Sequence, residues 1–319
     1  MKKIQYGILS TATIVPRFVK AVQNTNHSEV LAIASRSQNK ADALAKELNI
    51  ERAYGSYQQL YDDPEIDIIY IATINENHYQ DMMDALNHGK HVVCEKPFTL
   101  TTQQAREVFE LAKAKNLFLM EAQKSVFLPV TLQIKEYIDQ QKLGKLLQVE
   151  MSSSHTGKHS DGHWMLDQHQ GGAWIPSATY TIEYLDFLIG SKPDDYQAQL
   201  TLMETKAIDE VSINLRYQNV LAHSFISVKT ATKNTATFYF EEGYIEVFEF
   251  WKARGYTVHH WKTKEENYVS LPVDYEMIYE VNHIHECLSN NLITSPVMSP
   301  EMTINCVELV EAVYQQSLV

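Results

Sequence analysis

The chain is poor in cysteine, basic residues and long apolar runs, and each shortage narrows the kind of protein it can be. Its 3 cysteines among 319 residues are no disulfide framework, which favours a reducing compartment. The formal charge of −13 does not suit a surface that binds nucleic-acid phosphates. No apolar run has the length of a membrane span or the form of a signal peptide. We therefore expect a cytoplasmic protein that binds neither nucleic acid nor membranes.

The chain has the length of two domains, and its first third alternates between strand-like and helix-like segments. The strands are expected at 4–9, 30–35, 66–72, 91–95 and 117–122, and the helices at 14–23, 39–48, 78–87 and 102–115. Such alternation predicts a parallel sheet with helices on both faces. We expect residues 1–122 to form a doubly wound α/β Rossmann domain that binds a dinucleotide.

The pattern changes after residue 122, where β-rich segments follow one another. A helix is expected at 130–141, and strands at 146–154, 196–203, 211–217, 222–230, 236–240 and 244–248. These segments predict an α+β domain over residues 123–298, with a large, mainly antiparallel open sheet. Helices at 275–288 and 300–315 follow, and the helix at about 299–317 could pack back on the first domain.

The turn after the first strand lacks the glycines of the usual dinucleotide fingerprint. In the pattern G-x-G-x-x-G the glycines would fall on Ser10, Ala12 and Val15. The small side chains of Ser10 and Ala12 still permit a close approach of the backbone to a pyrophosphate at a helix N-terminus. An ordinary turn without a ligand explains the segment equally well. The cofactor-binding candidates here are Gly7, Ser10, Thr11, Ala12, Thr13 and Ile14.

The end of the second expected strand favours NADP over NAD, although NAD stays possible. An NAD site usually has an acidic residue here for the ribose 2′-hydroxyl, but this chain has Ser35 and Arg36. A guanidinium suits a 2′-phosphate, and Lys40 is a second cation nearby in sequence. The alternative is that Arg36 is an ordinary solvated surface residue.

Three further segments carry a resemblance to a known family. They are 63–67 (DPEID), 73–78 (TINENH) and 88–97 (HGKHVVCEKP), and supporting pieces extend over essentially the whole chain. This pattern closely resembles the glucose–fructose oxidoreductase/inositol dehydrogenase/rhizopine-catabolism (Gfo/Idh/MocA) family, in particular its dihydrodiol dehydrogenase-like branch. The resemblance implies a homodimer or homotetramer formed through the sheet of the second domain. It also implies hydride transfer between NAD(P) and a hydroxyl or carbonyl carbon of a sugar, polyol or diol.

By this resemblance, Lys96 is the catalytic lysine of the Glu-Lys-Pro motif. An ammonium group near the reacting oxygen would stabilise alkoxide character. Glu95 and Pro97 match residues that shape the turn under the nicotinamide, and a cis Lys96–Pro97 bond is expected. The remaining cofactor-binding candidates follow the third expected strand and are Thr73, Asn75 and His78.

The second family motif departs from its usual form at two positions. Pro176 stands where the family has an aspartate, and Tyr180 stands where it has a histidine. Some members use tyrosine at the latter position, so Tyr180 is the candidate general acid/base. The alternative is that Tyr180 only packs on its own helix. The proline side chain has no group that can hydrogen-bond a substrate hydroxyl. Pro176 therefore weakens the prediction of a sugar-like substrate more than it weakens the prediction of the cofactor.

A histidine-rich segment comes just before this motif. The spacing of His155, His159 and His163 would suit a metal ion on a helix, but the intervening glycines indicate a loop. We expect no metal and a loop that lines the substrate site instead. The substrate-binding candidates are His163, Trp164, Trp174 and Tyr180, with His283 a weaker one that could equally be an interior histidine.

These observations predict an NADP-dependent oxidoreductase that acts on the CH–OH group of a small sugar, polyol or diol-type substrate. A non-catalytic dinucleotide sensor on the same fold is the main alternative, because the usual glycines and the aspartate are absent. A third hypothesis is transient use of the nicotinamide in redox-assisted hydrolysis of a glycoside.

Overall fold

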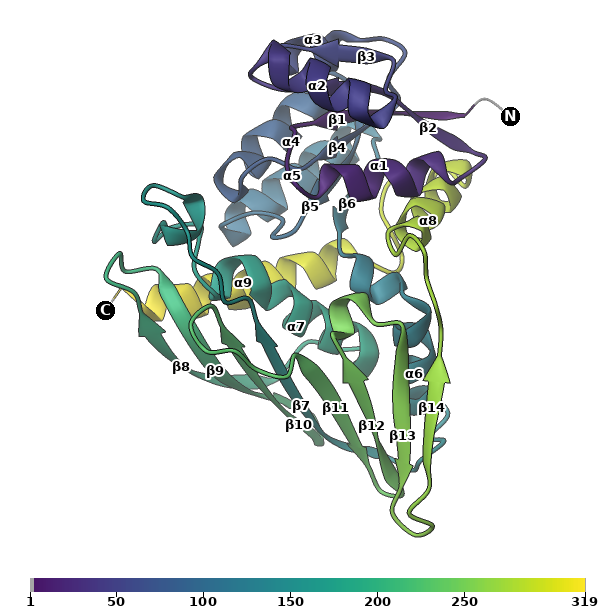
Figure 1. Cartoon of the computed structure of the whole chain (residues 1–319), viewed down its shortest axis with the longest axis vertical. Coiled ribbons are helices and arrows are strands. Elements are labelled where there is room, and N and C mark those ends of the chain that lie inside the picture. Colours follow the sequence, from purple (N-terminus) through teal and green to yellow (C-terminus); the bar gives the residue numbers. More distant parts are fainter. Residues whose placement is uncertain (1–2, 319) are drawn as a thin grey trace. The chain divides into compact units, whose positions relative to one another are not determined.

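The computed structural model describes residues 3–318 and divides the chain into two compact units (Figure 1). The first unit consists of Met1–Lys124 and Tyr275–Val307, and the second of Ser125–Asp274 and Glu308–Val319. Among the described residues, no helix combines the length and the apolar character needed to cross a membrane.

The first unit contains a six-stranded parallel sheet in the order β3-β2-β1-β4-β5-β6 (Figure 1). Its strands are β1 (Ile4–Leu9), β2 (Ser28–Ala34), β3 (Arg52–Tyr54), β4 (Ile68–Ile71), β5 (His91–Glu95) and β6 (Leu119–Ala122). Its helices are α1 (Val15–Gln23), α2 (Gln38–Leu48), α3 (Tyr57–Asp62), η1 (Asn75–Asn77), α4 (His78–Asn87), α5 (Thr102–Lys115) and α8 (Ile278–Ser289). The predicted doubly wound sheet is therefore confirmed, and the strand order reverses between β1 and β4. In such sheets the ligand crevice lies outside the carboxyl ends of the strands at that reversal.

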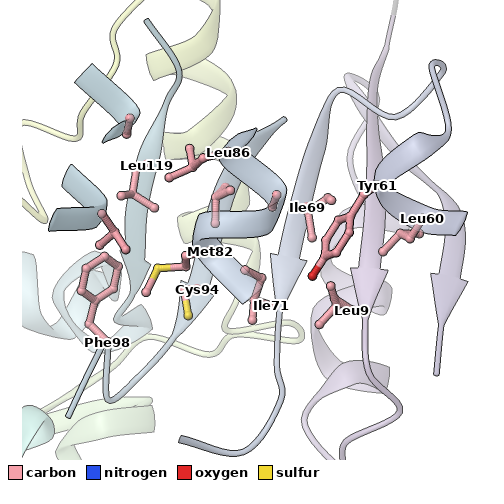
Figure 2. Close-up of a cluster of buried hydrophobic side chains, with 14 of the residues drawn as sticks. Leu9, Leu60, Tyr61, Ile69, Ile71, Met82, Leu86, Cys94, Phe98 and Leu119 are labelled. Carbon is pink, nitrogen blue, oxygen red and sulfur yellow. The ribbon is translucent and has the colours of Figure 1, made fainter. Parts of the chain in front are cut away.

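One hydrophobic core of this unit packs α3, α4 and α5 against the sheet, as Figure 2 shows. Ile69 and Ile71 of β4 and Cys94 of β5 are fully buried in it, together with Met82 of α4. The other face of β4 is buried as well, because every residue of Ile68–Ile71 is out of solvent contact. This burial on both faces explains why β4 reads as a continuous apolar run in the sequence.

The second unit contains an eight-stranded sheet in the order β14-β13-β12-β11-β7-β10-β9-β8. Its strands are β7 (Leu146–Ser154), β8 (Asp195–Leu202), β9 (Ile208–Tyr217), β10 (Val220–Ser227), β11 (Thr235–Phe240), β12 (Gly243–Phe248), β13 (Gly255–His260) and β14 (Glu266–Ser270). Its helices are η2 (Lys124–Phe127, whose first residue belongs to the first unit), α6 (Pro129–Asp139), η3 (Trp164–Leu166), α7 (Trp174–Ile189) and η4 (Phe250–Lys252). Neighbouring strands run antiparallel except β7 and β10, which pair in parallel. The sheet is therefore mixed and mostly antiparallel.

Helix α7 packs on β9 and β10, and nearly all of its residues are buried. Two glycines before it allow the chain to approach neighbouring backbone closely. A Cβ on Gly171 would lie 2.4 Å from the carbonyl oxygen of Trp164, and one on Gly172 would lie 2.3 Å from that of Ile208. Gly172 also has a positive φ of 75°, which side chains disfavour. These contacts fix where α7 begins.

Helix α9 (Pro300–Gln316) contributes to both units, because the division between them falls within it. The Ser299 hydroxyl accepts a hydrogen bond from the amide of Met302, as expected of an N-cap residue. Val307 belongs to the hydrophobic core of the first unit. Three residues later, the carbonyl oxygen of Val310 accepts the indole hydrogen bond of Trp174 within the second unit.

Candidate functional site

The turn after β1 keeps a glycine-like backbone although its first motif position is serine. Ser10 has a φ of 106°, a region that favours glycine. Its amide donates to the carbonyl of Ala34 at 3.0 Å, and its hydroxyl donates to that of Ala72 at 2.5 Å. The same hydroxyl accepts from the amide of Ala12 at 3.2 Å. Ser10 therefore joins the carboxyl ends of β1, β2 and β4 and holds the turn open toward α1.

The other candidates of this turn differ in their exposure. Gly7 lies inside β1, where a Cβ would meet Ile66 at 3.0 Å and Leu60 at 3.2 Å, so close packing accounts for this glycine. The side chains of Thr11, Ala12 and Ile14 are half-buried, and Thr13 is exposed. Helix α1 begins without a side-chain cap, but its first turn donates within the backbone: the amides of Val15 and Arg17 donate to the carbonyl oxygens of Ala12 and Ile14, and Pro16 has no N–H.

The end of β2 combines a buried serine with exposed cations. The Ser35 hydroxyl accepts from the amide of Ser37 at 3.3 Å, while Arg36 and Lys40 extend into solvent. Burial raises the pKa values of Asp81 and Tyr57, and the positive charge of Arg36 opposes both shifts. The exposed guanidinium is therefore within electrostatic reach of these two groups.

Asp81 was not predicted as a site residue, yet it is buried at this same edge. Its carboxylate accepts a hydrogen bond from the Thr73 hydroxyl at 2.6 Å. Burial raises the pKa of Asp81 to about 6, and the hydrogen bond from Thr73 opposes that shift. A residue's burial behind a strand end leaves no local signal in the sequence, which is why Asp81 was missed.

His78 connects two of the predicted cofactor segments. Its ring is 1% exposed, with Nδ1 at 2.8 Å from the carbonyl oxygen of Pro97 and Nε2 at 3.1 Å from that of Thr73. Burial lowers the pKa of His78, and the carbonyl oxygens of Pro97 and Thr73 oppose that shift. Asn75, one turn before it, is also buried. His78 thus holds the loop after β4 against the turn after β5.

That second turn carries Glu95, Lys96 and the cis Lys96–Pro97 peptide bond, which confirms the predicted isomer. Glu95 accepts a hydrogen bond from the Tyr70 hydroxyl at 2.5 Å. The ring of Tyr70 in turn stacks on Phe18 of α1, with 3.6 Å between centroids. Lys96 is half-buried in this turn. Its backbone is therefore held from both sides, by His78 and by the fixed carboxylate of Glu95.

In the second unit, Tyr180 lies half-buried on α7 beside an aromatic group that the sequence did not predict. Its ring centroid is 6.1 Å from that of Trp251 in η4, and His155 lies 5.3 Å from the same indole. Trp251 is 71 positions after Tyr180 (251 − 180), so no spacing pattern could have joined them. Trp251 is buried, Tyr180 is half-buried and His155 is exposed, so the accessible aromatic surface belongs to Tyr180 and His155, which pack on the indole.

The histidine-rich segment is a loop, as expected. His163 stacks on His159 at 4.5 Å and lies 5.8 Å from Trp164, while its Nδ1 accepts from the amide of Met165. His169 forms a hydrogen bond with the Tyr314 hydroxyl instead. Within residues 3–318, no three His, Cys, Asp or Glu side chains are grouped as metal ligands.

Two residues of the second motif have structural roles that account for their presence. Trp174 is fully buried, and its indole donates to Val310 at 3.0 Å, so core packing explains it without a substrate contact. Pro176 is buried in the first turn of α7, a position that tolerates proline. His283, the weaker candidate, is bound to Ser295 at 2.7 Å within the first unit.

Two family models match the chain. The model described as "Oxidoreductase family, NAD-binding Rossmann fold" matches residues 4–123. The "GFO/IDH/MocA C-terminal domain" matches residues 131–246. Together they cover well over half of the chain; the first spans the six-stranded sheet, and the second ends within β12 of the eight-stranded sheet.

Curated relatives match over nearly the whole chain. The chain is 31% identical over 309 residues to trans-1,2-dihydrobenzene-1,2-diol dehydrogenase of Mus musculus, covering 92% of this chain and 91% of the relative. It is 32% identical over 311 residues to the protein of that name from Xenopus laevis, with 92% of each covered.

Solved structures share the fold at lower identity. A 3-ketoreductase from Actinomadura kijaniata in complex with TDP-benzene and NADP aligns with a TM-score of 0.85 at 21% identity, over 98% of this chain and 96% of that one. An aldose–aldose oxidoreductase from Caulobacter crescentus aligns with a TM-score of 0.89 at 18% identity, over 99% and 98%. The family models and the curated relatives show that the chain belongs to the Gfo/Idh/MocA family of NAD(P)-dependent oxidoreductases.

Proposed function

We propose that this oxidoreductase uses NADP and transfers hydride to or from the carbon of a small diol, polyol or sugar-type hydroxyl or carbonyl group. The observation that carries the coenzyme preference is the end of β2, where exposed Arg36 and Lys40 follow buried Ser35. A guanidinium and nearby hydroxyl groups can bind a 2′-phosphate, for which NAD has no counterpart. Coenzyme binding is assigned to residues 1–122 and substrate binding to residues 123–298.

A ring-bearing diol fits the second unit better than an open-chain sugar. Tyr180 and His155 supply accessible ring faces that pack on the buried Trp251, and Pro176 supplies no hydrogen-bonding side chain where the family has an aspartate. Ring faces gain most from contact with a flat, partly apolar substrate. The relatives of Mus musculus and Xenopus laevis bear the name of a cyclic diol dehydrogenase. We therefore place cyclic vicinal diols first among the candidate substrates.

Lys96 and Tyr180 are proposed to divide the acid–base chemistry. When a hydroxyl is oxidised, its proton would pass to the phenolate oxygen of Tyr180 as the C–H bond gives up hydride. When a carbonyl is reduced, the Tyr180 hydroxyl returns that proton to the new alkoxide. The ammonium of Lys96 would stabilise the negative oxygen in either direction. NADP would supply or accept the hydride.

The proposal is tested by a double-mutant cycle of Lys96→Met and Tyr180→Phe, with turnover followed by NADPH absorbance. Each single variant is expected to lose about 10²–10⁴-fold in kcat, because each removes a group that acts in the transition state. The double variant should lose little more than the worse single variant if both groups act on one substrate atom. NADPH affinity, measured by fluorescence titration, should stay within a few-fold of the wild type in Tyr180→Phe.

Two results would contradict the proposal. Additive losses in the double variant would mean that Lys96 and Tyr180 do not act on the same atom. Binding of NADPH without turnover across a panel of cyclic diols, sugars and their carbonyl forms would favour the dinucleotide sensor instead. Tighter binding of NADH than of NADPH would remove the role proposed for Arg36.

We also propose that two copies associate through the open face of the second unit's sheet. The strand register places Leu221, Phe248 and Tyr268 on the face opposite α7, and each side chain is at least 60% exposed. Exposed apolar groups on one sheet face are typical of subunit interfaces. Leu221→Glu should yield monomers in light-scattering chromatography, whereas a wild type that is already monomeric would contradict the proposal.

A further inference from the structure

A cavity of about 580 Å³ lies in the second unit, at one end of its eight-stranded sheet. Its lining comes from β11, β12, β13 and β14 and from the segments that flank these strands. Because the four strands alternate in direction, β11 and β13 begin at this end, and β12 and β14 finish there. Neither Tyr180 nor Trp251 is among the lining residues. The cavity has the size of a small-molecule site and is not the aromatic region described above.

Two exposed aromatic rings of this lining flank a glycine. Phe248 on β12 is 61% exposed, and Tyr268 on β14 is 68% exposed. The register pairs Glu246 with Thr257, so two residues further on Phe248 stands opposite Gly255 of β13 (246 + 2 and 257 − 2). A Cβ on Gly255 would clash with the Tyr268 hydroxyl, so the phenol leans over the glycine. Gly255 therefore leaves room between the two rings on this sheet face.

Three cations in the lining come from outside the strands and are exposed: Lys233, Lys252 and Arg254. Lys252 forms an ion pair with Glu249 at 2.9 Å. Within residues 3–318, the side chains of Lys233 and Arg254 have neither an ion pair nor a hydrogen bond. The other acid of the lining, Glu246, lies 4.0 Å from a histidine ring nitrogen on β13. The cavity thus offers two uncommitted cations in a chain whose formal charge is −13.

The backbone that carries these cations is held by hydrogen bonds. The side-chain oxygen of Asn234, next to Lys233, accepts from the amide of Ser154 at 2.6 Å. The carbonyl oxygen of Asn234 accepts from the amide of Glu249 at 2.7 Å, which joins the segments before β11 and after β12. The carbonyl oxygen of Arg254 accepts at 2.8 Å from the segment after β14. A site whose backbone is already fixed loses less conformational entropy when a ligand binds.

We propose that this cavity binds a small organic anion that combines an aromatic ring with a carboxylate group. The ring lies against Phe248 and Tyr268, since aromatic faces and edges attract one another. The carboxylate meets Arg254 and Lys233, and a guanidinium can bind both of its oxygens at once. No bond is made or broken at this site. The inference is independent of the proposed function, because none of the residues assigned to coenzyme or substrate lines the cavity.

The subunit contact proposed above uses the same sheet face, including Phe248 and Tyr268. A second copy of the sheet is a poor occupant of the cavity itself, because a broad sheet face laid across a hollow leaves its volume unfilled. The uncommitted cations also lie beyond the strand ends rather than on the strands. A small anion and a second copy can therefore be accommodated together, with the ligand at the margin of the contact.

The site is tested by ligand-detected NMR titration of the full chain with benzoate at pH 7. Benzamide has the ring without the charge, and acetate has the charge without the ring. Benzoate should bind at least about tenfold more tightly than either. Arg254→Gln and Lys233→Gln should each weaken benzoate binding about tenfold, because each removes one charge-assisted contact. Lys262→Gln, at an exposed lysine of the turn at the opposite end of β13, should change it by less than about twofold.

The contribution of the ring is measured with Tyr268→Ala, which should weaken benzoate about fivefold and leave acetate unchanged. Benzamide binding as tightly as benzoate would overturn the proposal. Unchanged benzoate affinity in both Arg254→Gln and Lys233→Gln would mean that benzoate binds elsewhere, which also overturns it.

A last comparison separates the ligand from a second copy of the chain. The wild type and Leu221→Glu, whose substitution lies on β10 away from the cavity, should bind benzoate with the same affinity. Binding to Leu221→Glu alone would mean that a partner subunit fills the cavity, and the proposal would be wrong. Failure of NADPH to bind or turn over would overturn the proposed function and leave these benzoate results unaffected.

Discussion

The candidate region of the first unit and that of the second unit are held together by different kinds of contact. In the first unit, polar side chains at the strand ends are fixed by backbone hydrogen bonds, as with Ser10 and His78. In the second unit, Tyr180, Trp251 and His155 meet through ring faces. Directional hydrogen bonds suit a ligand whose shape is constant, and ring contacts tolerate variation. Under the proposed function, this difference predicts a fixed coenzyme specificity and a substrate preference that can vary.

The largest effect expected concerns two buried aspartates, one in each unit. Burial raises the pKa of Asp81 to about 6 and that of Asp186 to about 7, above the ordinary 3.8. Each folded carboxyl keeps a proton that the unfolded chain has lost, so stability falls as pH rises from 3.8 to the folded value. At about 1.4 kcal/mol per pH unit, the loss reaches up to about 3 kcal/mol for Asp81 and 4 kcal/mol for Asp186.

Urea unfolding of Asp81→Asn and Asp186→Asn between pH 4 and pH 8 measures these losses. The stability of Asp81→Asn relative to the wild type should stop rising near pH 6, and that of Asp186→Asn near pH 7. If both variants reached their plateau at the same pH, the two buried sites would not differ as described.

The next effect is on coenzyme discrimination in the first unit. Arg36→Ala should raise the dissociation constant of NADPH about 10- to 100-fold, because it removes charge-assisted hydrogen bonds to a phosphate. The dissociation constant of NADH should change by less than about twofold. Fluorescence titration checks both values, with Arg106→Ala as the matched control, since Arg106 is an exposed arginine on α5 of the same unit. An equal loss of affinity for NADPH and NADH would show that Arg36 does not bind the 2′-phosphate.

A smaller effect is expected in the aromatic region of the second unit. Trp251→Leu should raise KM for a cyclic diol about tenfold, because the buried indole on which Tyr180 and His155 pack is lost. NADPH affinity should not change. Steady-state kinetics provide the measurement, and Trp261→Leu is the control at an exposed tryptophan of the same unit. A variant with weakened NADPH binding and normal KM would assign Trp251 to the coenzyme instead.

The smallest effect concerns the glycine-like turn. Ser10→Ala keeps the unfavourable φ of 106° and loses both side-chain hydrogen bonds. Ser10→Gly loses the same bonds and removes the strain, so it should be more stable than Ser10→Ala by about 1 kcal/mol. Thermal unfolding of the two variants decides this, and a less stable glycine variant would indicate that the backbone is not strained.

Much of the first unit could be predicted because buried parallel strands are continuous apolar runs, as β4 illustrates. Strand β3 was missed because it has three residues and none is fully buried. Strand β14 was missed because it is a largely exposed edge strand. The parallel pairing of β7 with β10 could not be predicted from the sequence either. Side chains alternate with the same period whether neighbouring strands run parallel or antiparallel.

The residues of the candidate site likewise include some that the sequence could predict and others that it could not. Motif residues such as Lys96 and Tyr180 could be named because their neighbours in sequence identify them. The partners of those residues come from distant segments, as Trp251 does for Tyr180 and Tyr70 does for Glu95. Burial cannot be read from one position either, so the raised pKa of Asp81 required the structure.

Helix α9 has a consequence for biosynthesis. Because Val307 completes a core of the first unit and Val310 accepts the indole hydrogen bond of the second, both units need this helix. The first also needs residues 275–307, which are translated after most of the second. Neither unit can therefore reach its final packing on the ribosome until α9 has left the exit tunnel.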